Sequence, residues 1–152
     1  MAKTIAALLI ALTLTLAGCG RRPANATPDG AVRELVERLR RVHGDAADAR
    51  AAYELLSKRT QANLSARAQR YSAASGKMIA PEAMLAPSRF LVRFEPQRYV
   101  PKIAGAYALV DITGLLEGDH AQIACVFEDD VWHVELALPP LAPVQLRPGS
   151  GP

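Results

Sequence analysis

The sequence contains few of the residues that usually reveal an enzyme. Only two of its 152 residues are cysteines and three are histidines. It has no paired-cysteine metal motif, no glycine-rich phosphate loop and no Gly-x-Ser-x-Gly turn. No motif therefore specifies a substrate, a metal or a reaction, and we expect neither a cofactor nor a bound metal ion.

Aromatic residues are also scarce, at 5%, with a single tryptophan, although half of the chain is hydrophobic. Alanine, leucine and valine must therefore fill most of the core. At this length we expect one domain.

No charged block stands out, although the net charge is +3 and the pI is about 9.1. Basic and acidic residues alternate, as in Arg33-Glu34 and Glu37-Arg38. Such alternation is typical of a mixed solvated surface, so we expect no nucleic acid partner.

The N-terminus has the layout of a secretory signal. Lys3 precedes an uncharged apolar run of 13 residues, 5–17, which small residues follow. A stable membrane span needs about 20 apolar residues, so this run is short for one. We predict that residues 1–18 are a signal peptide, cleaved between Gly18 and Cys19.

The block Leu-Ala-Gly-Cys at 16–19 resembles the lipobox of bacterial lipoproteins. The resemblance implies that Cys19 carries fatty acyl chains such as palmitate and becomes the first mature residue. These chains would anchor the protein in the cell envelope. Gly20, in place of an aspartate, favours the outer membrane, facing the periplasm, over the inner membrane. The alternative is an ordinary cleaved signal in which the cysteine is coincidental.

If Cys19 is acylated, Cys125 is the only remaining thiol, and no intrachain disulfide can form. Cys125 lies in an apolar segment, 121–127, which has the pattern of a strand. A buried, inert thiol is therefore favoured over a nucleophile.

The rest of the chain divides into a tether at 19–27, a single domain at 28–138 and a proline-rich, disordered tail at 139–152. Helical periodicity predicts three helices before residue 76. Thr27, Pro28 and Asp29 form a start signal for the first, and Asp45 caps the second. Prolines bracket one further helical turn at 81–86.

After Pro87 the apolar period changes from helical to alternating, which predicts strands. The four segments are 90–95, 107–113, 121–127 and 131–138. Trp132 is expected to face the helices. Helices followed by strands indicate an α+β fold, with N-terminal helices packed on a curved antiparallel sheet of about four strands.

Three segments carry a resemblance to a known family. They are Gly-Asp-Ala-Ala-Asp-Ala at 44–49, Tyr-Glu-Leu-Leu-Ser at 53–57 and Glu-Asp-Asp-Val-Trp-His-Val-Glu-Leu at 128–136. They resemble the nuclear-transport-factor-2-like superfamily over roughly residues 29–138. The resemblance implies a cone of helices wrapped by a curved sheet. Members include isomerase-like and dehydratase-like enzymes, ligand-binding domains and lipoproteins, so fold does not decide function.

Asp111, His133 and Glu135 are the candidate pocket residues on the predicted strands. Acid–base catalysis needs a carboxylate or histidine in a sheltered site with a second group opposite it. Polar residues at alternate strand positions are also the ordinary pattern of a solvated face. We therefore expect a non-catalytic module that binds an envelope protein or an apolar ligand. The alternative is a small lyase or isomerase with Asp111 or His133 as base.

Overall fold

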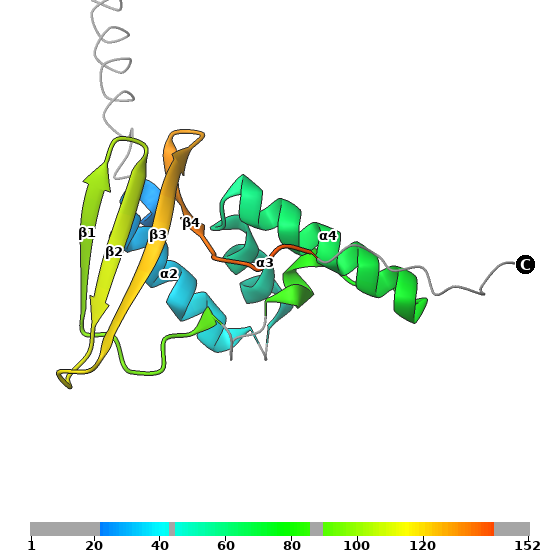
Figure 1. Cartoon of the computed structure of the whole chain (residues 1–152), viewed down its shortest axis with the longest axis horizontal. Helices are drawn as coiled ribbons and strands as arrows, with labels where there is room; N and C mark the ends of the chain where they lie inside the picture. The colour runs from blue at the N-terminus through cyan, green and yellow to red at the C-terminus, as the bar shows by residue number, and fades with distance from the viewer. Residues whose placement is uncertain (1–21, 43–44, 86–89, 142–152) are drawn as a thin grey trace, which may run out of the picture.

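The computed structural model describes residues 22–42, 45–85 and 90–141 (Figure 1). The predicted signal peptide, Cys19 and residues 142–152 of the tail lie outside this part. The fold is α+β, as predicted. The helical elements are η1 (Ala24–Ala26), α2 (Pro28–Arg41), α3 (Ala46–Glu54), α4 (Lys58–Ser75) and η2 (Pro81–Met84). The strands are β1 (Arg98–Ala104), β2 (Tyr107–Thr113), β3 (His120–Glu128) and β4 (Val131–Glu135).

The three longer helices begin at side chains that cap free backbone amides. Thr27, Asp45 and Ser57 each accept a hydrogen bond from an N–H two or three residues further on. The helix α4 ends at Gly76, whose φ of 69° is left-handed and suits glycine. Local sequence signals therefore set these helix ends.

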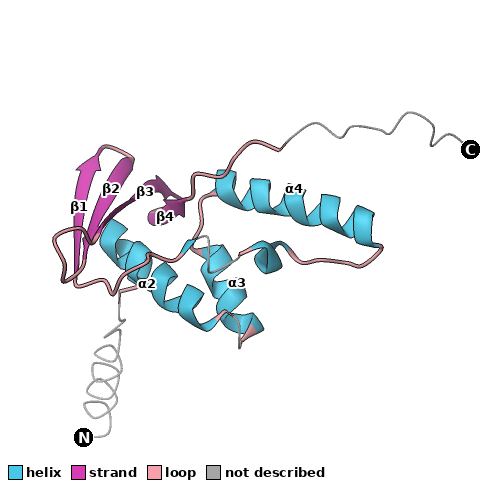
Figure 2. Cartoon of the chain, turned by 60° about the horizontal axis from the view of Figure 1, so that its bottom comes forward, coloured by secondary structure: helices cyan, strands magenta, loops and turns pink. Residues whose placement is uncertain are grey.

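Helix α2 forms the link between the sheet and the other helices (Figure 2). Its apolar stripe is almost fully buried and consists of Ala31, Val32, Leu35, Val36 and Leu39. The thiol of Cys125, on β3, donates to the carbonyl oxygen of Pro28 at 3.8 Å. The first turn of α2 therefore packs against β3, and Cys125 is buried as predicted.

A nearly buried carboxylate joins α2 to α3. Asp48 is 7% exposed, and its oxygens lie 2.6 Å from the guanidinium of Arg38 and 2.9 Å from that of Arg41. Hydrogen bonds from Arg41 and Arg38 lower the pKa of Asp48 below its ordinary value. Asp48 thus stays ionised at neutral pH and fixes the two helices together.

The four strands form an antiparallel sheet in the order β1-β2-β3-β4. Side chains on its inner face pack on α2, among them Val110, Ile112, Trp132 and Val134. The outer edge of β4 is bridged to the chain between α3 and α4. Ser57 N–H donates to the Val134 carbonyl at 2.9 Å, and Val134 N–H donates to the Leu55 carbonyl at 2.8 Å.

One predicted strand was wrong. Residues 90–95 form no strand, although Phe90, Val92 and Phe94 pack against the core. The first strand is instead β1, which contains Pro101 and Lys102. Proline is tolerated there because β1 is the edge of the sheet, and proline and lysine on an edge discourage further strand pairing. The last strand is also shorter than predicted, since β4 ends at Glu135.

The turn between β3 and β4 holds two left-handed aspartates. Asp129 and Asp130 have φ of 50° and 66°, as in a two-residue type I′ turn. Residues other than glycine adopt the left-handed backbone conformation at a cost in free energy, although aspartate does so more readily than most.

Asp130→Gly is expected to raise the free energy of unfolding by about 1 kcal/mol, because glycine has no Cβ to oppose a left-handed conformation. Chemical denaturation monitored by circular dichroism measures the change. Gly76→Ala is the control with the opposite expected sign. Gly76 has a left-handed φ of 69°, so adding a Cβ there should lower the free energy of unfolding. A loss of stability in Asp130→Gly would show that the Asp130 side chain stabilises the folded protein by more than the left-handed backbone conformation destabilises it.

Candidate functional site

The outer face of the sheet is the face that α2 leaves uncovered. In Figure 1 this face lies toward the viewer, and α2 lies behind the sheet. Residues paired across strands share a face, so the register assigns each outer side chain. Along β2 these are Tyr107, Leu109, Asp111 and Thr113, which are more exposed than the residues between them.

Asp111 lies in a polar cluster on this face. Its carboxylate is 2.7 Å from the ammonium of Lys102 on β1, and it accepts a hydrogen bond of 2.7 Å from the Gln122 amide on β3. The Nε2 of His120 is 3.8 Å away. The pKa of Asp111 is lowered below its ordinary value, mainly by the hydrogen bond from Lys102 and next by the hydrogen bond from Gln122. A carboxylate with a lowered pKa is a weak base, which reduces its fitness for proton abstraction.

Asp111→Asn is expected to cost stability at neutral pH and progressively less in acid. The folded-state pKa of Asp111 is lowered, so its contribution is present above the unfolded pKa of about 3.9 and is lost as pH falls through the folded value. Urea midpoints of both proteins from pH 7 to pH 2 would measure the difference. A difference that persists undiminished at pH 2 would show that ionisation is not its source.

Glu135 lies on β4, at the opposite edge of the sheet from β1, and its carboxylate is bound by side chains of the helical region. Its carboxylate accepts a hydrogen bond from the hydroxyl of Ser57, which is fully buried, and it lies 3.0 Å from Nε of Arg59. The Ser57 hydroxyl is also 3.0 Å from that of Thr60. Glu135 therefore fastens the start of α4 to β4, which is a structural role.

His133 shares the outer face with Glu135, as the alternation predicted, but not the cluster of Asp111. It pairs with Val126, which pairs with Tyr107, four residues along β2 from Asp111. A strand rises about 3.3 Å per residue, so four residues separate Asp111 and His133 by at least about 13 Å. The Nδ1 atom of His133 is shielded and has no hydrogen-bond partner among the described residues. The two candidate bases are thus not brought together.

The hairpin end of the outer face is apolar. A depression of about 430 Å³ is lined by residues of β1, β2 and β3. Tyr107, Leu109, Ala124 and Lys102 belong to the outer face by register, and Ile103, Ala108 and Cys125 also contribute to the lining. Tyr107 is 69% exposed and Leu109 is 45% exposed. The sequence placed Tyr107, Leu109 and Asp111 on one face, but it missed Lys102 because β1 was assigned to the wrong segment.

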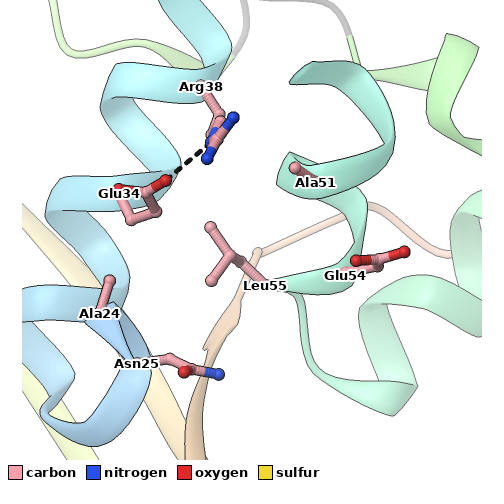
Figure 3. Close-up of a pocket in the computed structure, with 7 residues that line it drawn as sticks. All are labelled: Ala24, Asn25, Glu34, Arg38, Ala51, Glu54 and Leu55. Atoms are coloured by element: carbon pink, nitrogen blue, oxygen red, sulfur yellow. Dashed lines mark hydrogen bonds and ion pairs between the residues drawn. The ribbon is translucent and has the colours of Figure 1, made fainter. Parts of the chain in front are cut away.

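A second depression, of about 330 Å³, lies between η1, α2 and α3 (Figure 3). On the α2 side, Glu34 and Arg38 form an ion pair of 2.7 Å, and Leu55 faces them from the end of α3. Arg38 also pairs with Asp48. The charges of Glu34 and Arg38 are thus paired within the protein, which leaves less for a ligand to bind.

Two further observations concern the part of the chain that the structure describes. No three His, Cys, Asp or Glu side chains gather there in a way that could hold a metal ion. None of its helices is long and apolar enough to span a membrane.

The pKa of the buried Cys125 thiol is raised to about 12, chiefly by desolvation and to a smaller extent by the negative charge of Asp29. This thiol is protonated at neutral pH, so it is a poor nucleophile.

No protein-family model matches the chain, and comparisons with curated proteins and with solved structures gave no significant match.

Proposed function

We propose that the protein is a bacterial envelope lipoprotein, anchored through acyl chains on Cys19, whose domain binds a partner without catalysing a reaction. The Leu-Ala-Gly-Cys block at 16–19 supports the anchor, and Gly20 supports an outer-membrane location facing the periplasm. We also propose that the domain belongs to the nuclear-transport-factor-2-like superfamily, on the resemblance of segments 44–57 and 128–136. The partner is an envelope protein, or alternatively an apolar ligand.

The exposed apolar half of the outer sheet face carries the proposal. Leu109 remains solvent-accessible beside the depression of about 430 Å³. Exposed apolar surface of this kind is typical of binding sites. Asp111 is ion-paired and Glu135 is tied to Ser57, so both carboxylates already have partners. These contacts favour binding over acid–base catalysis.

Photocrosslinking in the native envelope tests the binding face. A photoreactive amino acid is placed at Leu109, on the outer face, or at Leu116, in the turn between β2 and β3. Both side chains are exposed, at 45% and 72%, and the control position 116 is the more accessible of the two, so an adduct from 109 alone would not be due to greater exposure. We expect a discrete adduct from position 109 alone, identified by mass spectrometry. Equal adducts from both positions, or none from 109, would contradict this assignment of the binding face.

A further inference from the structure

The hairpin between β1 and β2 ends in an exposed, uncharged tip. Residues 103–107 have the sequence Ile-Ala-Gly-Ala-Tyr, and all five are exposed. Ile103 is 58% exposed and Tyr107 is 69% exposed, although they lie on opposite faces of the sheet. Gly105 has a φ of 62° and makes the tight turn possible. Both faces of the tip are therefore exposed, and β3 runs beside it, since the Phe127 N–H donates to the Ala106 carbonyl at 2.7 Å.

This tip lies at the end of the sheet where α2 begins. Ile103 pairs with Ala108, and Ala108 pairs with Cys125. The Cys125 thiol contacts the carbonyl of Pro28, the first residue of α2. Figure 1 shows the β1–β2 hairpin and the N-terminal end of α2 at the same end of the domain, with the turn between β2 and β3 at the other.

The chain between Cys19 and the described domain is short. Arg22, the first described residue, follows Cys19 by three positions. An extended chain covers about 3.6 Å per residue, so Arg22 lies within about 11 Å of Cys19. Acyl chains on Cys19 would therefore hold this end of the domain against the bilayer.

Charge near the start of the described chain fits an anionic lipid surface. Arg22 and Arg33 line one depression beside η1 together with Glu34, and Arg21 precedes them in the sequence, so the charge there is basic on balance. Arginines close to a membrane are attracted to anionic headgroups. The acidic turn between β3 and β4 lies at the same end in Figure 1, next to the tip, because the Phe127 N–H donates to the Ala106 carbonyl. The Lys58 ammonium lies 2.9 Å from the Asp129 carboxylate and offsets part of the negative charge of that turn.

We infer that the β1–β2 hairpin tip is a second membrane contact, in which Ile103 and Tyr107 enter the interface of the bilayer that holds the acyl chains of Cys19. The inference rests on the proposed anchor at Cys19. Tyrosine is suited to this position because its ring is apolar and its hydroxyl can stay in the headgroup layer. An aliphatic side chain and an aromatic ring beside a lipid anchor would orient the domain, since the anchor alone leaves it free to turn.

Spin labels on the full-length protein test this contact. The lipoprotein is purified from its membranes and reconstituted into vesicles of phosphatidylethanolamine and phosphatidylglycerol. A nitroxide is attached at Ala106→Cys in the tip or at Gly118→Cys in the opposite turn, where an added Cβ meets no atom within 4 Å. The parent protein, labelled in the same way, measures background from Cys19 and from buried Cys125.

We expect the ratio of oxygen to nickel-chelate accessibility to be several-fold higher at position 106 than at 118. Combining the tip label with Ile103→Ser and Tyr107→Ser should lower the ratio to that of position 118, with the circular dichroism spectrum unchanged.

The outcomes separate the two proposals. If the protein is acylated and floats with the vesicles but both labels report water, the hairpin contact is refuted and the anchor stands. If the parent protein carries no acyl chain and does not float, the anchor is refuted and the hairpin contact with it.

Discussion

Trp132→Ala is expected to lower the free energy of unfolding by about 3–5 kcal/mol, as large-to-small core substitutions do. Trp132 is 8% exposed on the inner face of β4, the strand that packs against both α2 and η1. Its ring centroid lies 5.3 Å from that of Phe127, with the ring planes tilted by 59°. Removing the indole leaves a cavity in a core built mainly from alanine, leucine and valine, and the structure around such a cavity relaxes only partially.

Denaturation followed by circular dichroism is the appropriate measurement, since the variant loses its only tryptophan. Tyr71→Ala is the matched control, because that aromatic ring is 59% exposed on α4 and should cost little. Trp132→Phe should retain part of the packing and fall between the two. An unchanged midpoint in Trp132→Ala would show that the ring contributes no packing energy on the inner face.

The helices could be predicted because their signals are local. Thr27, Asp45 and Gly76 act within one turn of their own positions, so their neighbours in the sequence suffice to place these helix ends. Strand β2 was predicted with its observed bounds because alternation is likewise local. These elements account for most of the fold.

The error at residues 90–95 arose because alternation does not require a hydrogen-bonded partner. Phe90, Val92 and Phe94 cover the core as an irregular segment. Strand β1 gave little signal because Pro101 and Lys102 are compatible with a strand only at an edge, and edge position is a property of the whole sheet.

The candidate site depended on long-range contacts that no spacing reveals. Asp111 was identified, but its partner Lys102 was not, because the strand carrying Lys102 had been misplaced. Glu135 was assigned to the outer face from alternation, whereas its hydrogen bond reaches Ser57, 78 positions earlier in the chain. Such contacts decide whether a carboxylate is a base or a structural link.

Cys19→Ala is expected to abolish fatty-acid incorporation and leave an uncleaved or unacylated precursor. The acyl chains require the cysteine sulfur if the block at 16–19 acts as a lipobox, and alanine supplies no such group. Each buried CH₂ contributes about 0.8 kcal/mol to membrane binding, and stable anchoring needs at least two chains. The loss should therefore remove durable attachment through lipid, without altering the described domain.

Labelling cells with radioactive palmitate measures this directly. The matched control is Cys125→Ala, which removes the other cysteine, buried on β3, and should leave incorporation intact. Fractionation by itself is insufficient, because an uncleaved apolar run at 5–17 could retain the precursor at the membrane. Label entering Cys19→Ala would contradict the anchor assignment. Loss of label in Cys125→Ala, with folding retained, would show that the acyl chains are attached to Cys125 and that their assignment to Cys19 is wrong.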